Sequence, residues 1–317
     1  MDLLRKLMDT DGISGNEKNV RDFIRKEIMP HVDKCESDEM GNLIAAKKGD
    51  KPVLMLAAHM DEIGLMAKHI DDDGNIFFTT LGGIDPWTML TQRVRIPTRH
   101  GDITGVITTQ AMSNNDTVDD IPKLDDLFID TGLTKKEIDD RDIKPGAYVS
   151  LVQDSGYMAD DSIIYGKALD DRIGCYVLIE LAKRLRKVDQ AIYFVFTVQE
   201  EIGLYGAKTS AYRIKPEWSI AVDVTSAEDK KSQKTNALGK GPCLTIKDAS
   251  MVTNACINSW IEEIAKKLSI PLQREVSDKG TTDALSISLS RGGIPTTSVG
   301  VAVRNLHSTI GMASIDD

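Results

Sequence analysis

Short apolar runs alternate along the chain with segments in which apolar residues recur every three to four positions. The runs lie at Val53–Ala58, Ala191–Val198, Ile220–Val224 and Pro295–Val303. Mostly apolar runs of this length are typical of strands buried on both faces inside a parallel sheet. Helical spacing of apolar residues is found at Val20–Ile28, Leu178–Leu185 and Ile257–Leu268. The alternation predicts an α/β fold with a mostly parallel sheet flanked by helices.

The segment from Ser14 to Glu17 has the S-x-x-E pattern of a capping box, in which both side chains satisfy free backbone N–H groups at a helix start. The pattern predicts that a helix begins here, and Pro30 predicts that it ends before that residue. Val20 and Ile28 would lie on its buried face.

The chain from 64 to 156 has a different pattern, with short β-like segments separated by Gly, Asp and Asn turns. The predicted strands are Ile76–Thr80, Val94–Ile96, Ile103–Thr109 and Tyr148–Val152, with one helix near Lys135–Asp139. We therefore expect a separate β-rich module at 64–156, inserted into a main domain made of residues 1–63 and 157–317.

Composition narrows the classes of partner and compartment. The 317 residues carry a formal net charge of -10, which argues against nucleic acid and anionic membranes because both attract clustered Lys and Arg. The four cysteines form no C-x-x-C pair, so neither a zinc ribbon nor a thioredoxin-like site is supported. The N-terminus lacks the apolar core of a signal peptide, and no apolar run approaches the ~18–20 residues that cross a bilayer. We expect a cytoplasmic protein.

Acidic and imidazole side chains follow the predicted strands. In chain order they are His59, Asp61, Glu200, Glu201 and Asp223, and Asp170 at a helix start and His307 after the last strand complete the set. Ligands of open α/β sheets gather at the carboxyl ends of the strands. These side chains can therefore converge on one site although they are far apart in the sequence.

The set fits a centre with two divalent metal ions. Such a centre needs a bridging carboxylate and further His or carboxylate ligands, and it activates a shared water toward a carbonyl. A carboxylate that is not a ligand must then move protons, so Glu200 and Glu201 could divide these two roles. Asp61 could accept the second imidazole N–H of His59 and fix its tautomer. Ligands of these types suit zinc, cobalt or manganese.

Each of these residues taken alone has a simpler interpretation. A single His at a strand end is more often a surface or core residue than a ligand, and a Glu-Glu pair is usually solvated. No acidic pattern at strand-end spacing accompanies His31, His69 or His100, and we assign them no role. The metal hypothesis depends on the joint occurrence of the whole set.

Several segments around these residues resemble one known family. They are AAHMDEIG (57–64), GKALDDRIGC (166–175), TVQEEIGLYGA (197–207), AVDVTSA (221–227), GTTDA (280–284) and RGGIPTTSVGVAVRNLHS (291–308). Together they are similar to the signature segments of the tetrahedral aminopeptidases, which include glutamyl and deblocking aminopeptidases and proteins once labelled cellulases. The similarity extends over nearly the whole chain.

The resemblance implies a role for each residue. The metal ligands would be His59 and Asp223 on one ion, Glu201 and His307 on the other, and Asp170 as the bridge. Glu200 would be the general base, and Asp61 would orient His59.

The resemblance also implies an activity and an assembly. The expected reaction is metal-dependent hydrolysis of N-terminal residues from peptides. A glutamyl or aspartyl preference is one option, which Arg172 or Arg304 could favour. Residues 64–156 would form a β-barrel-like dimerisation domain, and the dimers would assemble into a tetrahedral dodecamer that admits only peptides able to enter it.

Two positions differ from the family pattern. Asn305 stands where many members carry an aromatic residue, which could alter the substrate pocket. The chain ends at Asp317, soon after the last expected ligand, where members usually continue with a further helix. We therefore expect apolar surface of the sheet to be exposed there.

Three other functions are open on the sequence alone. An amidohydrolase or deacylase of small acylated amino acids could use the same centre, although the β-rich module and the QEEIGLYGA segment favour a peptidase. A glycosidase could use two carboxylates, but aromatic residues make up only 5% and the two histidines would have no role. A catalytically silent assembly protein is disfavoured because every ligand position is filled.

Overall fold

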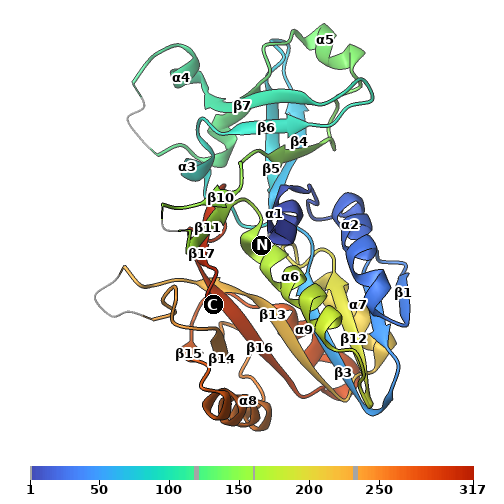
Figure 1. The fold of residues 1–317 in the computed structure, drawn as a ribbon. Helices are drawn as coiled ribbons and strands as arrows, with labels where there is room; N and C mark the ends of the chain where they lie inside the picture. Colours follow the sequence, from blue (N-terminus) through green and yellow to red (C-terminus); the bar gives the residue numbers. More distant parts are fainter. Residues whose placement is uncertain (1, 118–120, 160, 231–234) are drawn as a thin grey trace.

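The chain folds into a large mixed sheet covered by helices and a separate small barrel (Figure 1). The computed structural model describes residues 2–117, 121–159, 161–230 and 235–317. In the sequence, the barrel strands follow β3 (Asp50–His59) and precede β10 (Gly156–Tyr157). The predicted α/β class with an inserted β-barrel is confirmed.

The large sheet has the strand order β1-β2-β12-β3-β13-β16-β17-β11-β10. Its four central strands β12, β3, β13 and β16 are parallel, whereas β2 and β17 join them antiparallel, so the sheet is mixed. The four apolar runs of the sequence are these central strands. The bounds are β1 (Lys34–Ser37), β2 (Leu43–Lys47), β11 (Ile163–Gly166), β12 (Gln190–Thr197), β13 (Trp218–Ser226), β14 (Cys243–Lys247), β15 (Gln273–Val276), β16 (Thr296–Arg304) and β17 (Gly311–Ser314).

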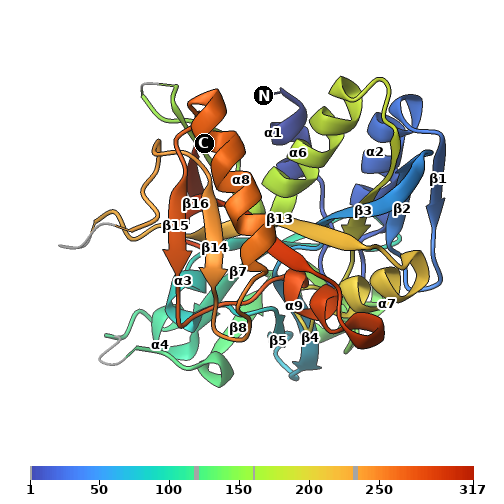
Figure 2. The ribbon, with the colours of Figure 1, turned by 90° about the horizontal axis from the view of Figure 1, so that it is seen from below.

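Helices cover both faces of this sheet. Figure 2 shows α1 (Asp2–Asp9), α2 (Lys18–Ile28) and α6 (Leu169–Arg184) on one face, and α7 (Tyr205–Ile214) and α9 (Asp283–Ser288) on the other. Successive side chains of a strand point to opposite faces of the sheet. In β3, Leu56 and Ala58 accordingly pack with α2 and α6, and Met55 and Ala57 pack with α7 and α9. The remaining helices of this part are α8 (Ala255–Leu268), η1 (Met29–His31) and η3 (Ser290–Gly292). Among the described helices, none has the length and apolar character needed to span a membrane.

The start of α2 differs from the predicted capping box. The helix begins at Lys18, and its N-cap residue Glu17 makes no side-chain capping hydrogen bond. Ser14 Oγ instead donates to Asp61 Oδ2 at 2.6 Å, and Glu17 Oε1 accepts from the backbone N–H of Gly15 at 2.6 Å. The predicted cap was wrong, because Ser14 lies outside the helix and contacts a strand end distant in the sequence. The helix itself, with Val20 and Ile28 buried and its end before Pro30, is confirmed.

Six antiparallel strands close the barrel in the order β4-β5-β8-β7-β6-β9. Alternate side chains fill its interior, and Leu65, Ile107 and Val149 are fully buried there. The strands are β4 (Gly64–Ile70), β5 (Ile76–Leu81), β6 (Arg93–Ile96), β7 (Ile103–Thr109), β8 (Leu127–Asp130) and β9 (Tyr148–Leu151). The connections contain α3 (Pro86–Met89), α4 (Gln110–Ser113), η2 (Leu124–Asp126) and α5 (Lys135–Asp140), the last being the helix predicted there.

Candidate metal centre

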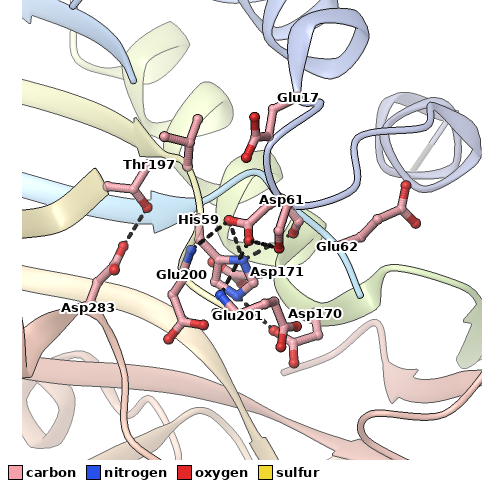
Figure 3. Close-up of polar contacts among 12 residues, drawn as sticks. Glu17, His59, Asp61, Glu62, Asp170, Asp171, Thr197, Glu200, Glu201 and Asp283 are labelled. Carbon is pink, nitrogen blue, oxygen red and sulfur yellow. Dashed lines mark hydrogen bonds and ion pairs between the residues drawn. The ribbon is translucent and has the colours of Figure 1, made fainter. Parts of the chain in front are cut away.

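The carboxyl ends of the parallel strands carry the predicted ligands. His59 is the last residue of β3, Asp223 lies in the second half of β13, and Glu201 follows β12. Strands β12 and β13 lie on either side of β3, so the three strand ends are neighbours. Figure 3 shows how side chains from the ends of β3 and β12 and from the start of α6 gather around His59.

Two groups of ligand atoms could each hold a metal ion. His59, Asp170 and Asp223 form one group, and Asp170, Glu201 and His307 form the other; within each group the ligand atoms lie within 4.8 Å of one another. Asp170 belongs to both groups, because its Oδ1 is 2.9 Å from His59 Nε2 and its Oδ2 is 3.3 Å from His307 Nε2. This is the arrangement expected of a carboxylate that bridges two ions.

The charges of this cluster fit divalent cations. Glu201 Oε1 is buried and has no hydrogen-bond partner among the described residues. Burial and the nearby Asp170 raise the pKa of Glu201 to about 8. Burial also raises the pKa of Asp223 to about 7, although the His59 imidazole opposes this. Crowded buried carboxylates resist ionisation unless a cation compensates them, so this donor set matches metal ions well.

Asp170 and the two imidazoles stabilise one another's charged forms. Burial opposes a charge on His59, but hydrogen bonds with Asp170 and Asp61 raise the pKa of His59 well above its ordinary value. A hydrogen bond with Asp170 likewise raises the pKa of His307 to about 9. Burial disfavours ionised Asp170, yet its hydrogen bonds with His307 and His59 hold its pKa below the ordinary value. Metal ions bind neutral imidazole, so loading this centre would release protons.

Main-chain carbonyls orient both imidazoles. His59 Nδ1 lies 3.1 Å from the backbone oxygen of Asp61 and 3.6 Å from its carboxylate Oδ1. The nearest acceptor is thus the backbone and not the carboxylate that the sequence suggested. His307 Nδ1 lies 3.0 Å from the carbonyl oxygen of Gly83, in the barrel loop after β5. Both Nε2 atoms are therefore left to face Asp170.

The Asp61 carboxylate holds the turn that carries the adjacent glutamates. Its Oδ1 accepts the backbone N–H of Glu200 at 3.0 Å, and its Oδ2 accepts that of Glu201 at 3.3 Å. Asp61 itself is 0% exposed. Gln199, the first residue of the turn, has a left-handed φ of 55°. The Asp61 carboxylate thus holds the turn directly and also lies 3.6 Å from the His59 imidazole, and its role in orienting His59 stays a prediction.

The two glutamates face different partners. Glu201 Oε2 lies 3.8 Å from His307 Nε2, whereas Glu200 belongs to neither ligand group. Burial, opposed by the charge of His59, raises the pKa of Glu200 well above its ordinary value. A half-buried carboxyl beside the ligands but outside both groups suits proton transfer.

The two arginines that could favour an acidic substrate are engaged elsewhere. Arg172 is 0% exposed, and its Nη1 donates to the main-chain carbonyls of Leu7 and Thr10. Arg304 donates two hydrogen bonds to Asp229 at 2.9 and 2.5 Å. Arg172 is thus buried and Arg304 is ion-paired, and the suggestion that either favours an acidic substrate stays a prediction. The pocket beside the ligands is lined by Ile63, Leu169, Asn305 and Leu306.

Two buried acids beside the centre received no role from the sequence. Asp171 is 0% exposed and accepts the backbone N–H of Gly174 at 2.9 Å, and burial together with Asp223 raises its pKa well above the ordinary value. Asp283 is 2% exposed, accepts a hydrogen bond from Thr197 Oγ1, and has its pKa raised to about 6 by burial. Both lie in segments that carry the family resemblance, but residue type alone does not separate a buried acid from a ligand.

A family model described as M42 glutamyl aminopeptidase matches residues 41–317 of the chain. The chain belongs to the M42 aminopeptidase family. It is therefore a hydrolase, and the matched region contains both proposed ligand groups.

Relatives of this M42 family member match over its whole length. A lysyl aminopeptidase of Pyrococcus furiosus is 34% identical over 328 residues, which cover 100% of this chain and 92% of the relative. A TET aminopeptidase of a marine sediment Thaumarchaeota archaeon has a TM-score of 0.95 at 32% identity, covering 100% of this chain and 92% of that one. The Pyrococcus horikoshii TET1 peptidase has a TM-score of 0.89 at 31% identity, and the match covers 100% of this chain and 94% of that one. The TET1 peptidase can assemble into a tetrahedron or a large octahedral shell. The M42 chain thus has the TET aminopeptidase fold.

Proposed function

We propose that the chain is a dinuclear-metal aminopeptidase that releases N-terminal residues from peptides. The observation that carries this proposal is the shared position of Asp170 between two groups of ligand atoms, at the strand ends of an M42 fold. Because its two oxygens face different imidazoles, the Asp170 carboxylate can offer one oxygen to an ion on each side.

The ligand assignment follows from the two groups. His59 and Asp223 would hold one ion, Glu201 and His307 the other, and Asp170 both. When bound, two ions such as zinc, cobalt or manganese supply Lewis-acid activation of water and of the scissile carbonyl.

Glu200 is the proposed general base. Its carboxylate would take a proton from the attacking water and return it to the nitrogen of the leaving amine. Its raised pKa supports this role, because the protonated form must be stable enough to exist between the two transfers. The hydrogen bond from its backbone N–H to Asp61 fixes the main chain from which the side chain projects.

The acidic surroundings of the centre favour an aminopeptidase over a deacylase. Glu200 and Asp283 lie next to the ligands and belong to neither group. In their ionised forms, which bound cations would favour, these carboxylates would attract a free α-ammonium group. An acylated amino acid carries no such charge at that position. The family description refers to glutamyl residues and the Pyrococcus furiosus name to lysyl residues, so the substrate panel must contain both.

The test uses purified protein that has been stripped with a chelator and then supplied with zinc, cobalt or manganese. Glutamyl, lysyl and leucyl anilides are compared with their N-acetylated forms. We expect hydrolysis of the free aminoacyl substrates only, and only after metal is restored. Hydrolysis of the acetylated forms alone would indicate a deacylase, and activity that survives stripping would exclude the metal mechanism.

A Glu200→Gln variant tests the base. We expect kcat to fall by roughly 10²–10⁴-fold while both ions are retained, because Glu200 lies outside both ligand groups. Glu263→Gln, at an exposed position of α8, is the matched control and should leave kcat unchanged. Full activity of the Glu200 variant would rule out the assignment.

We also propose that the chain forms dimers through the barrel domain at 64–156, and that these assemble into a tetrahedral dodecamer in the cytoplasm. The assembly described for the TET1 relative supports this. Trp260, Leu268 and Ile270, on and just after α8, are 48%, 61% and 46% exposed, and exposed large apolar side chains are available for contacts between chains. The four cysteines are unpaired, as in proteins of reducing compartments. Light scattering coupled to size exclusion tests the assembly, and a monomer at micromolar concentration would refute it.

A further inference from the structure

The S-x-x-E segment ahead of α2 contacts the turn that carries the proposed base. Ser14 is 2% exposed, and its Oγ donates to Asp61 Oδ2 at 2.6 Å. The same carboxylate accepts the backbone N–H groups of Glu200 and Glu201. The Ser14 hydroxyl is therefore linked through one carboxylate to the main chain of both glutamates.

Glu17 lies close to the first residue of the same turn. It is 5% exposed, and Figure 3 shows it beside the strand ends that carry Thr197 and Asp61. Burial raises the pKa of Glu17, although the backbone N–H groups of Gly15 and Gln199 favour its charged form. Gln199 has the left-handed φ of 55°, which a side-chain-bearing residue keeps only when its surroundings hold it.

The main chain of the segment is itself fixed to the end of β3. The N–H of Ser14 donates to the carbonyl of Glu62 at 3.3 Å, and the N–H of Glu62 donates to the carbonyl of Gly12 at 2.9 Å. The N–H of Gly12 donates to Glu62 Oε1 at 2.8 Å, and a Cβ at Gly12 would clash with Val20 Cγ1. The Ser14 hydroxyl is thus presented to Asp61 by a backbone that has little freedom.

We infer that Ser14 is a positioning residue that fixes the Asp61 carboxylate and, through it, the turn carrying Glu200 and Glu201, with Glu17 as a second support. A carboxylate held by three donors from two separate segments has one orientation. Without the Ser14 hydroxyl, Asp61 keeps only the donors of the turn itself, so the turn and the carboxylate can shift together. The catalytic consequence rests on the proposed function, whereas the structural consequence does not.

The structural consequence is measured by hydrogen exchange on the metal-free protein. In Ser14→Ala we expect the backbone amides of Glu200 and Glu201 to exchange roughly tenfold faster than in the wild type, because loss of a hydrogen bond to a charged group is worth about one power of ten or more. Ser210→Ala is the matched control, since Ser210 is 0% exposed and donates to the carbonyl of Ala207 within α7. It should leave these amides unchanged. Equal exchange in Ser14→Ala and the wild type would overturn the inference, whatever the enzyme hydrolyses.

Conservative variants separate positioning from packing. Ser14→Thr keeps the hydroxyl and should restore slow exchange of the turn. Ser14→Cys keeps the size but offers only a weak S–H donor, so it should behave like Ser14→Ala with less change in packing. If Ser14→Cys exchanged like the wild type, packing rather than the hydrogen bond would hold the turn, and the inference would be wrong.

The catalytic consequence is measured by steady-state kinetics of the metal-loaded protein. We expect Ser14→Ala to lower kcat roughly tenfold to a hundredfold with KM within about twofold of the wild type, and Glu17→Gln to lower kcat by a smaller factor. In an Asp61→Asn background, Ser14→Ala should lower kcat by less than about a further twofold, because the effects of substitutions within one hydrogen-bond network are not additive. The same loss in both backgrounds would show that Ser14 does not act through Asp61. Faster exchange in a protein without aminopeptidase activity would sink the proposed function and leave the positioning role intact.

Discussion

Replacing Asp170 by Asn tests the shared ligand directly. The substitution preserves the volume of the side chain, removes one negative charge, and converts one of the two oxygens into an NH₂ donor. Because Oδ1 faces His59 and Oδ2 faces His307, one ligand group loses its oxygen to the NH₂ while the other keeps only an uncharged amide oxygen, so both groups are weakened. Loss of an outer hydrogen-bond partner of a ligand costs about 10–100-fold in metal affinity. We therefore expect the loss of this charged ligand to lower the binding affinity of each ion by more than about 100-fold, or more than about 2.7 kcal/mol.

Single-site variants provide the comparison. Asp223→Asn changes only the group with His59, and His307→Ala changes only the group with Glu201. Metal content per subunit is measured after dialysis against micromolar zinc, with circular dichroism as a check on folding. We expect about two ions in the wild type, about one in each single-site variant, and less than one in Asp170→Asn.

The reasoning is refuted if Asp170→Asn still retains one ion at wild-type affinity. That result would mean that Asp170 serves one site only and that the two groups are independent. Loss of both ions in Asp223→Asn as well would instead indicate that the sites fill only together, and a metal titration would show this as a single transition.

The charge of the centre and the buried core give two further predictions. Folding raises the pKa of Glu201 from 4.5 to about 8 and that of His307 from 6.5 to about 9. Between its unfolded and its folded pKa, each group binds more protons in the folded state than in the unfolded state. The unfolding temperature of the metal-free protein should accordingly fall as the pH rises from about 5 to 9. Over the same range, the increase in unfolding temperature that zinc produces should become larger. A metal-free unfolding temperature that stays constant or rises with pH in calorimetry would contradict this. Phe194→Ala, at a 0% exposed position of β12, should lower the free energy of unfolding by about 3–5 kcal/mol. Trp87→Ala, at a 59% exposed position, should cost less than about 1 kcal/mol in the same denaturant titration, and equal losses would count against the described core.

The central strands and the acids at their ends could be predicted from the sequence because both signals are local. A strand covered by helices on both faces must be apolar along its length, and the run Ala191–Val198 accordingly became β12 (Gln190–Thr197). The polar residues directly after such a run lie at the strand end wherever the strand is placed. The barrel strand Ile103–Thr109 was predicted with the bounds it has in the structure.

Other elements could not be found in this way. Strand β4 (Gly64–Ile70) contains Lys68 and His69, and β8 (Leu127–Asp130) has only four residues, so neither carries a strong pattern of its own. These two segments become strands because they pair with barrel strands, some of which are distant in the sequence. The antiparallel edges of the large sheet likewise follow from tertiary pairing, as between β12 and β2.

The sequence by itself determined the class of fold, the residue types of the centre and their order along the chain, because periodicity and strand-end placement are properties of short segments. Only the tertiary structure decided how those residues are used. It put Asp170 between two imidazoles, turned the Asp61 carboxylate toward the backbone of Glu200, and brought Ser14 to that carboxylate instead of to a helix start. A hydrogen bond between distant segments leaves no periodic trace, and a backbone acceptor such as the Gly83 carbonyl leaves no trace in residue type, so both become visible only when the chain is folded.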